Sequence, residues 1–198
     1  RGSTIELRPR LGFDPRLAYR QRDVPAASHP PLAACMARLA GRVEGDSVWD
    51  PFCGSGLELV ERGLLGGVRR LIGTDLSSAA VAIAQTNFVA AKLESIPAEF
   101  HCADFREFAA GPDLEPGSVT LIITNPPMGK RVPIADLQGL IEDLFRVAAT
   151  TLRPGGRLVF ANPLRIDAPS TSLRREFRQV VDFGGFDCGL EMYRKLNR

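Results

Sequence analysis

The 198-residue sequence has few of the residues that build metal centres and covalent cross-links. It contains four cysteines, none in a Cys-x-x-Cys pair, and two histidines, so it favours neither a zinc site nor a disulfide framework. Scattered cysteines of this kind are expected to be reduced and largely buried, as in cytosolic proteins. We therefore expect a cytoplasmic protein without a metal centre.

Long apolar runs and a signal sequence are also missing. No apolar stretch approaches the roughly 18 residues of a membrane span, so no membrane partner is expected. Hydrophobic residues make up 44% of the chain and charged residues 24%, which is enough for one α/β core and is unlike a disordered composition. Because the sequence begins with Arg1, we expect this residue to mark either a cut from a longer polypeptide or the remnant of a tag.

Lysine is scarce among the basic residues. Of the 25 basic residues only Lys92, Lys130 and Lys195 are lysines, and the formal net charge is +2. Arginine forks suit phosphates, but an arginine-rich surface is also what a GC-rich genome produces. We interpret most arginine clusters as solvated surface, with the pair Lys130 and Arg131 as the exception.

Short apolar runs alternate strictly with helical segments along the chain. Strands are expected at residues 46–50, 69–75, 98–102, 118–124 and 156–161, and helices from Ser28 or His29 to Gly41, at 57–65, 78–92 and 135–151, and after Asp104. This alternation predicts a doubly wound, mostly parallel sheet. Gly184 and Gly185 separate two further runs, 177–183 and 186–193, without room for a helix, so the seven-stranded sheet should end in an antiparallel hairpin.

Three of the predicted strands end in or just before an acid. The strand that ends at Asp50 runs into a turn containing Gly54 and Gly56, a context in which glycines let the backbone approach a nucleotide. The next strand ends at Asp75, near the spacing of about 20 residues at which such units present a carboxylate to ribose hydroxyls. Asp104 follows a third strand, and the carboxyl ends of parallel strands line the ligand crevice.

The fourth predicted strand stops abruptly at Asn125, which precedes Pro126, Pro127 and Met128. Each proline fixes its own φ and pushes the preceding residue into an extended conformation, so the oxygens of Asn125 and Pro126 are held in a narrow range of directions. Such a pair suits a site that grips an NH2 group. Taken alone, the segment is equally well explained as a proline-rich turn that Asn125 caps.

Together these motifs resemble a known family. Asp50-Pro51-Phe52-Cys53-Gly54-Ser55-Gly56 followed by Asn125-Pro126-Pro127 resembles the class I S-adenosylmethionine-dependent methyltransferases that modify exocyclic amino groups. Residues 14–20 and 24–30 are similar to the segment that precedes the catalytic domain in the THUMP-associated RNA guanine-N2 methyltransferases. The resemblance covers nearly the whole chain. It departs at Met128, where the family commonly has an aromatic residue that stacks on the target base.

The resemblance implies that S-adenosyl-L-methionine is the cofactor. Asp50 would orient the glycine turn or the methionine ammonium, Asp75 would take the ribose hydroxyls, and Asp104 would accept from the adenine amino group. The expected cofactor site consists of Asp50, Phe52, Gly54, Gly56, Asp75, Leu76, Asp104, Phe105 and Asn125. The three acids could also be turn or cap residues, and Phe52 and Phe105 fit a packing role better than a stacking one.

The implied chemistry addresses a weak nucleophile. An exocyclic amine delocalises its lone pair into the ring, and two acceptors, the side chain of Asn125 and the carbonyl of Pro126, could aim that lone pair at a methyl group. The catalytic site would then be Asn125, Pro126, Pro127 and Met128, with Lys130 and Arg131 near a substrate phosphate. The expected reaction is methylation of guanine N2 in RNA, either tRNA or rRNA.

Other functions would also fit parts of this pattern. Methylation of adenine in DNA or RNA, or of a glutamine side chain, poses the same electronic problem, and Met128 could mark a non-catalytic RNA-binding module. A nicotinamide oxidoreductase is disfavoured because the glycine turn lacks the third glycine of that motif.

We expect residues 1–27 to be an irregular lead-in and 28–198 the catalytic domain, with an RNA-binding domain upstream of the sequence.

Overall fold

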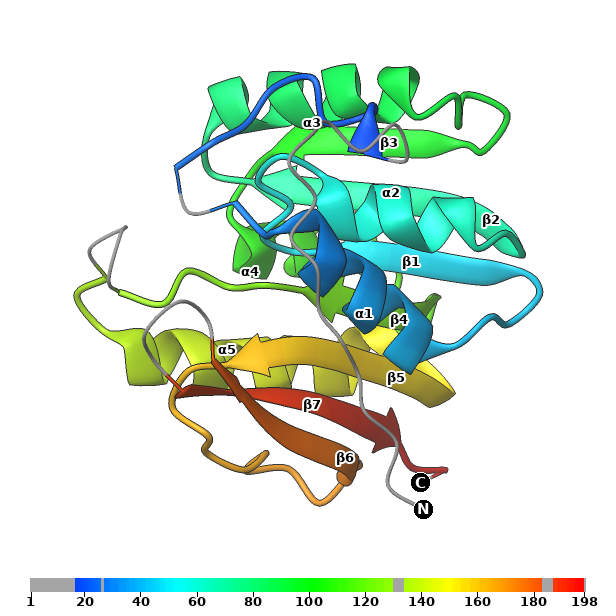
Figure 1. Cartoon of the computed structure of the whole chain (residues 1–198). Coiled ribbons are helices and arrows are strands. Elements are labelled where there is room, and N and C mark those ends of the chain that lie inside the picture. Colours follow the sequence, from blue (N-terminus) through cyan, green and yellow to red (C-terminus); the bar gives the residue numbers. More distant parts are fainter. Residues whose placement is uncertain (1–16, 26, 130–133, 183–186, 198) are drawn as a thin grey trace, which may run out of the picture.

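Seven strands form a single sheet in the order β3-β2-β1-β4-β5-β7-β6 (Figure 1). The computed structural model describes residues 17–25, 27–129, 134–182 and 187–197. The strands are β1 (Asp46–Asp50), β2 (Val68–Asp75), β3 (Ala98–Cys102), β4 (Val119–Thr124), β5 (Leu152–Asn162), β6 (Leu173–Asp182) and β7 (Asp187–Lys195). The helices are α1 (Pro30–Ala40), α2 (Leu57–Leu64), α3 (Ser78–Ala90), α4 (Phe105–Ala110) and α5 (Leu137–Thr151).

The sheet confirms the predicted topology. β1 pairs in parallel with β2 on one side and β4 on the other, and β3 and β5 extend the parallel part. β7 lies antiparallel between β5 and β6, as the hairpin prediction requires, although Gly184 and Gly185 lie outside the described residues. The chain first builds outward from β1 to β3 and then returns to place β4 on the other side of β1. That reversal is where open α/β sheets bind ligands.

Helices cover both faces of the sheet (Figure 1). The apolar residues of α1, α2 and α3 pack into one core cluster, and those of α4 and α5 into a second. β4 is buried at all six positions because it lies between these clusters, which explains its sequence of mostly apolar and β-branched residues. Its two threonines, Thr120 and Thr124, donate their hydroxyls to Asp46 and Asp50. The helices thereby leave the carboxyl ends of β1, β2 and β4 in one rigid frame.

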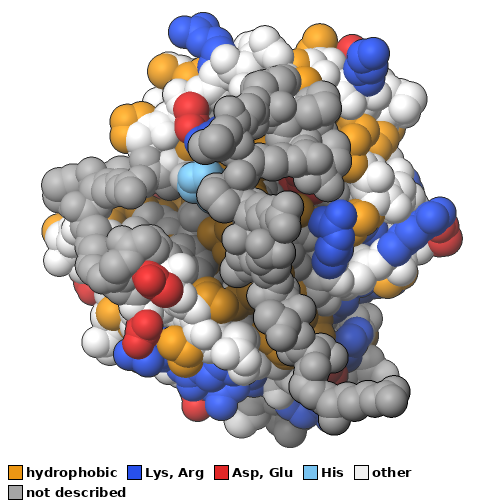
Figure 2. All heavy atoms as spheres, in the orientation of Figure 1, with side chains coloured by type: hydrophobic (Ala, Val, Ile, Leu, Met, Phe, Trp, Pro, Cys, Tyr) orange, Lys and Arg blue, Asp and Glu red, His pale blue; other side chains and the backbone are white. Residues whose placement is uncertain are grey.

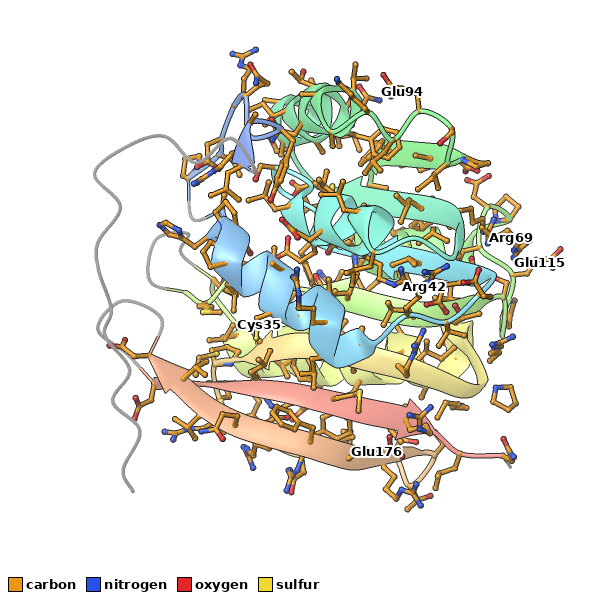
Figure 3. All side chains as sticks on the ribbon, turned by 45° about the vertical axis from the view of Figure 1, so that its right-hand side comes forward. Cys35, Arg42, Arg69, Glu94, Glu115 and Glu176 are labelled. Carbon is orange, nitrogen blue, oxygen red and sulfur yellow. The ribbon has the colours of Figure 1, made fainter. Side chains whose placement is uncertain are left out.

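The cysteines are only partly as expected. Cys53 and Cys188 are buried, but Cys35 and Cys102 are exposed, and Cys35 points away from the sheet on α1 (Figure 3). The expectation that they are largely buried was therefore wrong for two of the four. Within the described ranges no helix is long and apolar enough to cross a membrane.

The described part of the lead-in, residues 17–25 and 27, packs closely against α2 and α3. Tyr19 is 4% exposed and donates a hydrogen bond to Glu61 of α2. The buried amide of Asn87 in α3 accepts from the backbone N–H groups of Gln21 and Arg22, at 2.9 and 3.1 Å. Its Nδ2 donates to the carbonyls of Arg22 and Ser55, both at 2.9 Å. One side chain therefore ties the lead-in to the glycine turn.

A buried ion cluster joins the other end of β1 to its neighbours. Asp46 is fully buried and accepts from Arg62 of α2 at 2.6 Å and from Arg157 of β5 at 2.6 and 2.7 Å. Burial opposes ionisation of Asp46, but hydrogen bonds from Thr120 and Arg62 and the charge of Arg157 outweigh it and hold the pKa of the carboxyl below its usual value. One carboxylate thus compensates two buried guanidinium groups.

Replacing Asp46 should destabilise the fold strongly. Asp46→Asn removes the only carboxylate bonded to Arg62 and Arg157 in the described structure, so two buried cations lose their counter-charge. We expect the free energy of unfolding to fall by about 3–5 kcal/mol in urea titrations. Asp113→Asn, at an exposed position, is the matched control and should change little. Equal stability of the two variants would show that the cluster does not stabilise the fold.

Candidate active site

A cleft of about 1370 Å³ opens at the carboxyl ends of β1, β2 and β4. It is about three times as large as a second cavity, of about 440 Å³, that Gly41, Thr120 and Arg157 help to line. The predicted site residues that line it are Phe52, Gly54, Asp75, Leu76, Asp104, Phe105, Asn125, Pro126, Pro127 and Met128. Asp50 and Gly56 lie behind its wall. Lys130 and Arg131 lie outside the described residues.

Asp50 organises the wall of the cleft from behind. Its carboxyl group is fully buried, and Oδ1 accepts from the backbone N–H of Phe52 at 3.1 Å and from the hydroxyl of Thr124 at 2.6 Å. The contact with Phe52 is the turn-orienting role that the sequence predicted as one alternative. Oδ2 has no hydrogen-bond partner in the described structure.

The two positions of the turn require glycine for different physical reasons. Both have positive φ, +50° for Gly54 and +80° for Gly56, which disfavours other residues. A Cβ on Gly56 would lie 3.0 Å from the Cβ of Ala84, so this glycine allows α3 to pack against the turn rather than a ligand to approach. Gly54 lines the cleft itself and is the position where a ligand can approach the backbone.

Asp75 links the end of β2 to the same turn. Its Oδ2 accepts from the backbone N–H of Gly54 at 3.0 Å, and its Oδ1 accepts from that of Ser77 at 2.9 Å. Each carboxylate oxygen can accept a further hydrogen bond, and Asp75 lines the cleft. The next residue, Leu76, is 74% exposed, so a large apolar side chain stands uncovered at the cleft.

Asp104 is a helix cap. Its Oδ1 accepts from the backbone N–H of Arg106 at 2.8 Å at the start of α4, and the Arg106 guanidinium grips both carboxylate oxygens at 2.9 Å. The hydrogen bond from Arg106 holds the pKa of Asp104 below its usual value. The cap role that the sequence allowed is therefore present, and the carboxylate lines the cleft as well.

Aromatic packing closes this side of the cleft. The rings of Phe52 and Phe105 lie 4.8 Å apart, and Phe105 is 3% exposed, which fits the packing role expected for both.

Burial, with the nearby charge of Asp50, raises the pKa of the Cys53 thiol, so Cys53 is an apolar filler rather than a nucleophile.

Ser28 and Glu58 line the cleft but were not predicted as site residues. Asn125 donates through Nδ2 to the hydroxyl of Ser28 at 2.9 Å, and Ser28 in turn donates to Glu58 of α2. Ser28 and Glu58 are 6% and 4% exposed, and both line the cleft. The Oδ1 atom of Asn125 is buried and has no partner among the residues that the structure describes. No local pattern marks this contact, since the three residues are far apart in sequence.

The buried carboxyl groups make the cleft suitable for a cation. Burial raises the pKa of Asp50, and the charge of Glu58 raises it further. Burial also raises the pKa of Glu58, whereas its hydrogen bond from Ser28 acts in the opposite direction. A positively charged ligand would favour the ionised form of both groups and offset the cost of burying them.

The arginines of the hairpin are largely paired with acids. Glu176 on β6 accepts from Arg174 at 2.9 Å and from Arg194 at 2.8 Å (Figure 3), and Arg175 pairs with Asp167. Figure 2 shows basic and acidic side chains mixed at the lower end of the face, near β6 and β7. This mixture fits the solvated-surface interpretation of these clusters.

Comparison with known proteins agrees with the geometry. A "tRNA (guanine(10)-N2)-dimethyltransferase" of Methanocaldococcus jannaschii is 31% identical over 173 residues, which are 83% of this chain and 46% of that protein. A "Probable tRNA (guanine(10)-N2)-dimethyltransferase" of Methanothermococcus thermolithotrophicus is 32% identical over 142 residues, or 69% of this chain and 82% of that protein. The crystal structure of TrmN from Thermus thermophilus matches with a TM-score of 0.70 and 28% identity, over 92% of this chain and 52% of that one.

The fold and the cleft define a class I methyltransferase domain. The family model described as "RMKL-like, methyltransferase domain" matches residues 17–190, so the chain belongs to that family. The chain spans about half the length of the Methanocaldococcus and Thermus proteins, 46% and 52%.

Asp75 should contribute to cofactor binding. Asp75→Ala removes the acceptor that fixes the Gly54 turn and that faces the cleft, so we expect S-adenosylmethionine binding to weaken by about 1.5–3 kcal/mol in calorimetry. Glu94→Ala, an exposed carboxylate on the loop after α3 (Figure 3), is the control. Unchanged affinity in the Asp75 variant would rule out its assignment to the cofactor.

Proposed function

We propose that the protein transfers a methyl group from S-adenosylmethionine to the exocyclic N2 of guanine in tRNA. The observation that carries this proposal is the unpartnered, buried Oδ1 of Asn125, which stands at the end of β4 in the same cleft as the Gly54 turn. The names of the two archaeal relatives support guanine N2 and tRNA over the alternatives of adenine and glutamine.

The residues of the cleft fit the cofactor of the family. Asp50 Oδ2 and Ser55 Oγ are buried polar atoms without partners in the described structure, and both belong to the segment around the glycine turn. The buried carboxyl groups of Asp50 and Glu58 suit the positive charge of an ammonium or a sulfonium. Asp75 is the proposed acceptor for ribose hydroxyls, with Leu76, Asp104 and Phe105 around the adenine. When bound, the cofactor supplies an electrophilic methyl group.

Asn125 and Pro126 supply the positioning. The Oδ1 atom of Asn125 accepts one N–H of the target amine, and the backbone carbonyl of Pro126 accepts the other, so the nitrogen lone pair points away from the ring plane. With the cofactor bound, the lone pair held in this way would face the methyl group that the cofactor supplies, and the excess proton of the product would leave to water. Preorganised acceptors act here without a general base, because the nitrogen becomes acidic only as the bond forms.

Met128 and the residues that follow it form the proposed substrate side of the cleft. Met128 is half-buried at the cleft and offers a polarizable contact to the face of the base. Lys130 and Arg131 follow it directly and are proposed to reach a phosphate of the RNA. We also propose that residues 1–27 join the catalytic domain, 28–198, to an RNA-binding domain upstream, and that the protein acts in the cytoplasm.

Asn125→Ala should abolish most of the transfer. The prolines and therefore the turn remain, but the acceptor for the target amine is lost, so the single-turnover rate should fall at least about a hundredfold. The assay uses labelled S-adenosylmethionine and the full-length protein, with unmodified tRNA transcripts, rRNA and DNA in parallel. Cofactor affinity should barely change, and Gln179→Ala, an exposed amide on β6, should retain the parent rate. A parent rate in Asn125→Ala would exclude this mechanism.

Met128 should affect substrate binding more than chemistry. Met128→Ala removes the contact with the base and is expected to raise KM for tRNA a few-fold at an almost constant kcat. Met128→Tyr should retain transfer, since an aromatic ring can stack on a base, which is worth about 1–3 kcal/mol. A loss of kcat with unchanged KM in both variants would place Met128 outside the base pocket.

A further inference from the structure

Three polar side chains from separate parts of the chain form a continuous hydrogen-bonded row in the cleft. Ser28 precedes α1, Glu58 lies in the first turn of α2, and Asn125 follows β4. Asn125 Nδ2 donates to Ser28 Oγ at 2.9 Å, and Ser28 Oγ donates to Glu58 Oε1. Figure 1 shows α1 and α2 side by side on one face of the sheet, so the row is anchored on two packed helices and a strand end.

This row fixes which end of the Asn125 amide faces the cleft. A serine hydroxyl has one proton, and when Glu58 is ionised, the form that a cationic ligand favours, that proton goes to the Glu58 carboxylate. The Ser28 oxygen can then only accept from Asn125, so it must meet the NH2 end of the amide. The Oδ1 end is left unpartnered in the described structure. In the flipped amide, two oxygens would face each other with the serine proton already committed.

The row also strengthens Oδ1 as an acceptor. Glu58 is 4% exposed, so its charge acts through a poorly solvated path. Hydrogen bonds in a chain polarise one another, and a carboxylate at the far end draws the amide N–H toward Ser28 and increases the negative charge on Oδ1. An amine held by that oxygen gains the electron density that the transfer requires.

We propose that Ser28 and Glu58 are positioning residues for methyl transfer, which hold the Asn125 carboxamide with its oxygen toward the target amine. The inference rests on the proposed function, because it requires Asn125 to accept from the substrate. Neither residue touches the reacting atoms in this account. Both act through Asn125, and that dependence can be measured.

A double-mutant cycle tests the dependence. In the full-length protein, Ser28→Ala should lower the single-turnover rate on an unmodified tRNA transcript about tenfold, the effect of losing one orienting hydrogen bond. In the Asn125→Ala background, the same change should have no further effect, because the amide that it orients is gone. Cofactor affinity, measured by calorimetry, should stay at the parent value in Ser28→Ala.

Conservative variants separate orientation from packing. Ser28→Thr keeps the hydroxyl and should stay within a few-fold of the parent rate. Glu58→Gln keeps an oxygen that can accept from Ser28, so it should transfer faster than Glu58→Leu, which cannot. Ser172→Ala, which removes a part-buried hydrogen bond to the Ser170 hydroxyl in the loop that joins β5 to β6, is the matched control and should leave the rate unchanged. Thermal unfolding of each variant identifies any loss of folded protein.

The outcomes distinguish a failure of the positioning role from a failure of the proposed function. An equal, additive loss from Ser28→Ala in both backgrounds, or a parent rate in Ser28→Ala with a slow Asn125→Ala, would overturn the positioning role and leave the proposed function intact. A parent rate in Asn125→Ala would overturn the proposed function and this inference with it.

Discussion

The buried carboxyl group of Asp50 is the contact on which the geometry of the cleft depends. β1 and β4 are registered at Val48↔Leu121 and Trp49↔Ile122, before their carboxyl ends. Beyond that pairing, Asp50 Oδ1 bonds both the Thr124 hydroxyl and the Phe52 N–H, and so holds the end of β4 against the turn that follows β1. The glycine turn and Asn125 therefore keep a fixed relation, as a reaction between a cofactor and a substrate requires.

Much of this architecture could be predicted because it follows from local periodicity. The short apolar runs became β1, β2 and β4, and the two terminal runs without a helix between them became β6 and β7. Helix α2 shows the limit of such patterns. A helix was predicted at residues 57–65, but no pattern indicated that its charged residues Glu58, Glu61 and Arg62 are buried. Each pairs with a residue that lies far away in sequence, namely Ser28, Tyr19 and Asp46, and long-range pairing leaves no periodic signal.

The site shows the same division between local and long-range information. Acids at strand ends could be predicted, but one residue type serves caps, turns and ligands, so the sequence alone could not separate these roles. Asp104 is a cap and also lines the cleft, while Asp50 orders the turn from behind it. Gly56 is a glycine because Ala84 approaches it, a reason that only the packing of α3 reveals.

The contacts of the Asn125 amide favour one of the two interpretations that its sequence left open. A capping asparagine would use its oxygen to accept a backbone N–H. Here the NH2 end is bonded to Ser28, and the oxygen has no partner among the described residues although it is buried. Leaving a buried acceptor without a hydrogen bond costs about 1–3 kcal/mol, and a cap whose oxygen accepts no hydrogen bond does not stabilise the fold. The cost is understandable if the oxygen is kept free for a donor that arrives with the substrate, which is the arrangement that a methyltransferase acting on an amine needs.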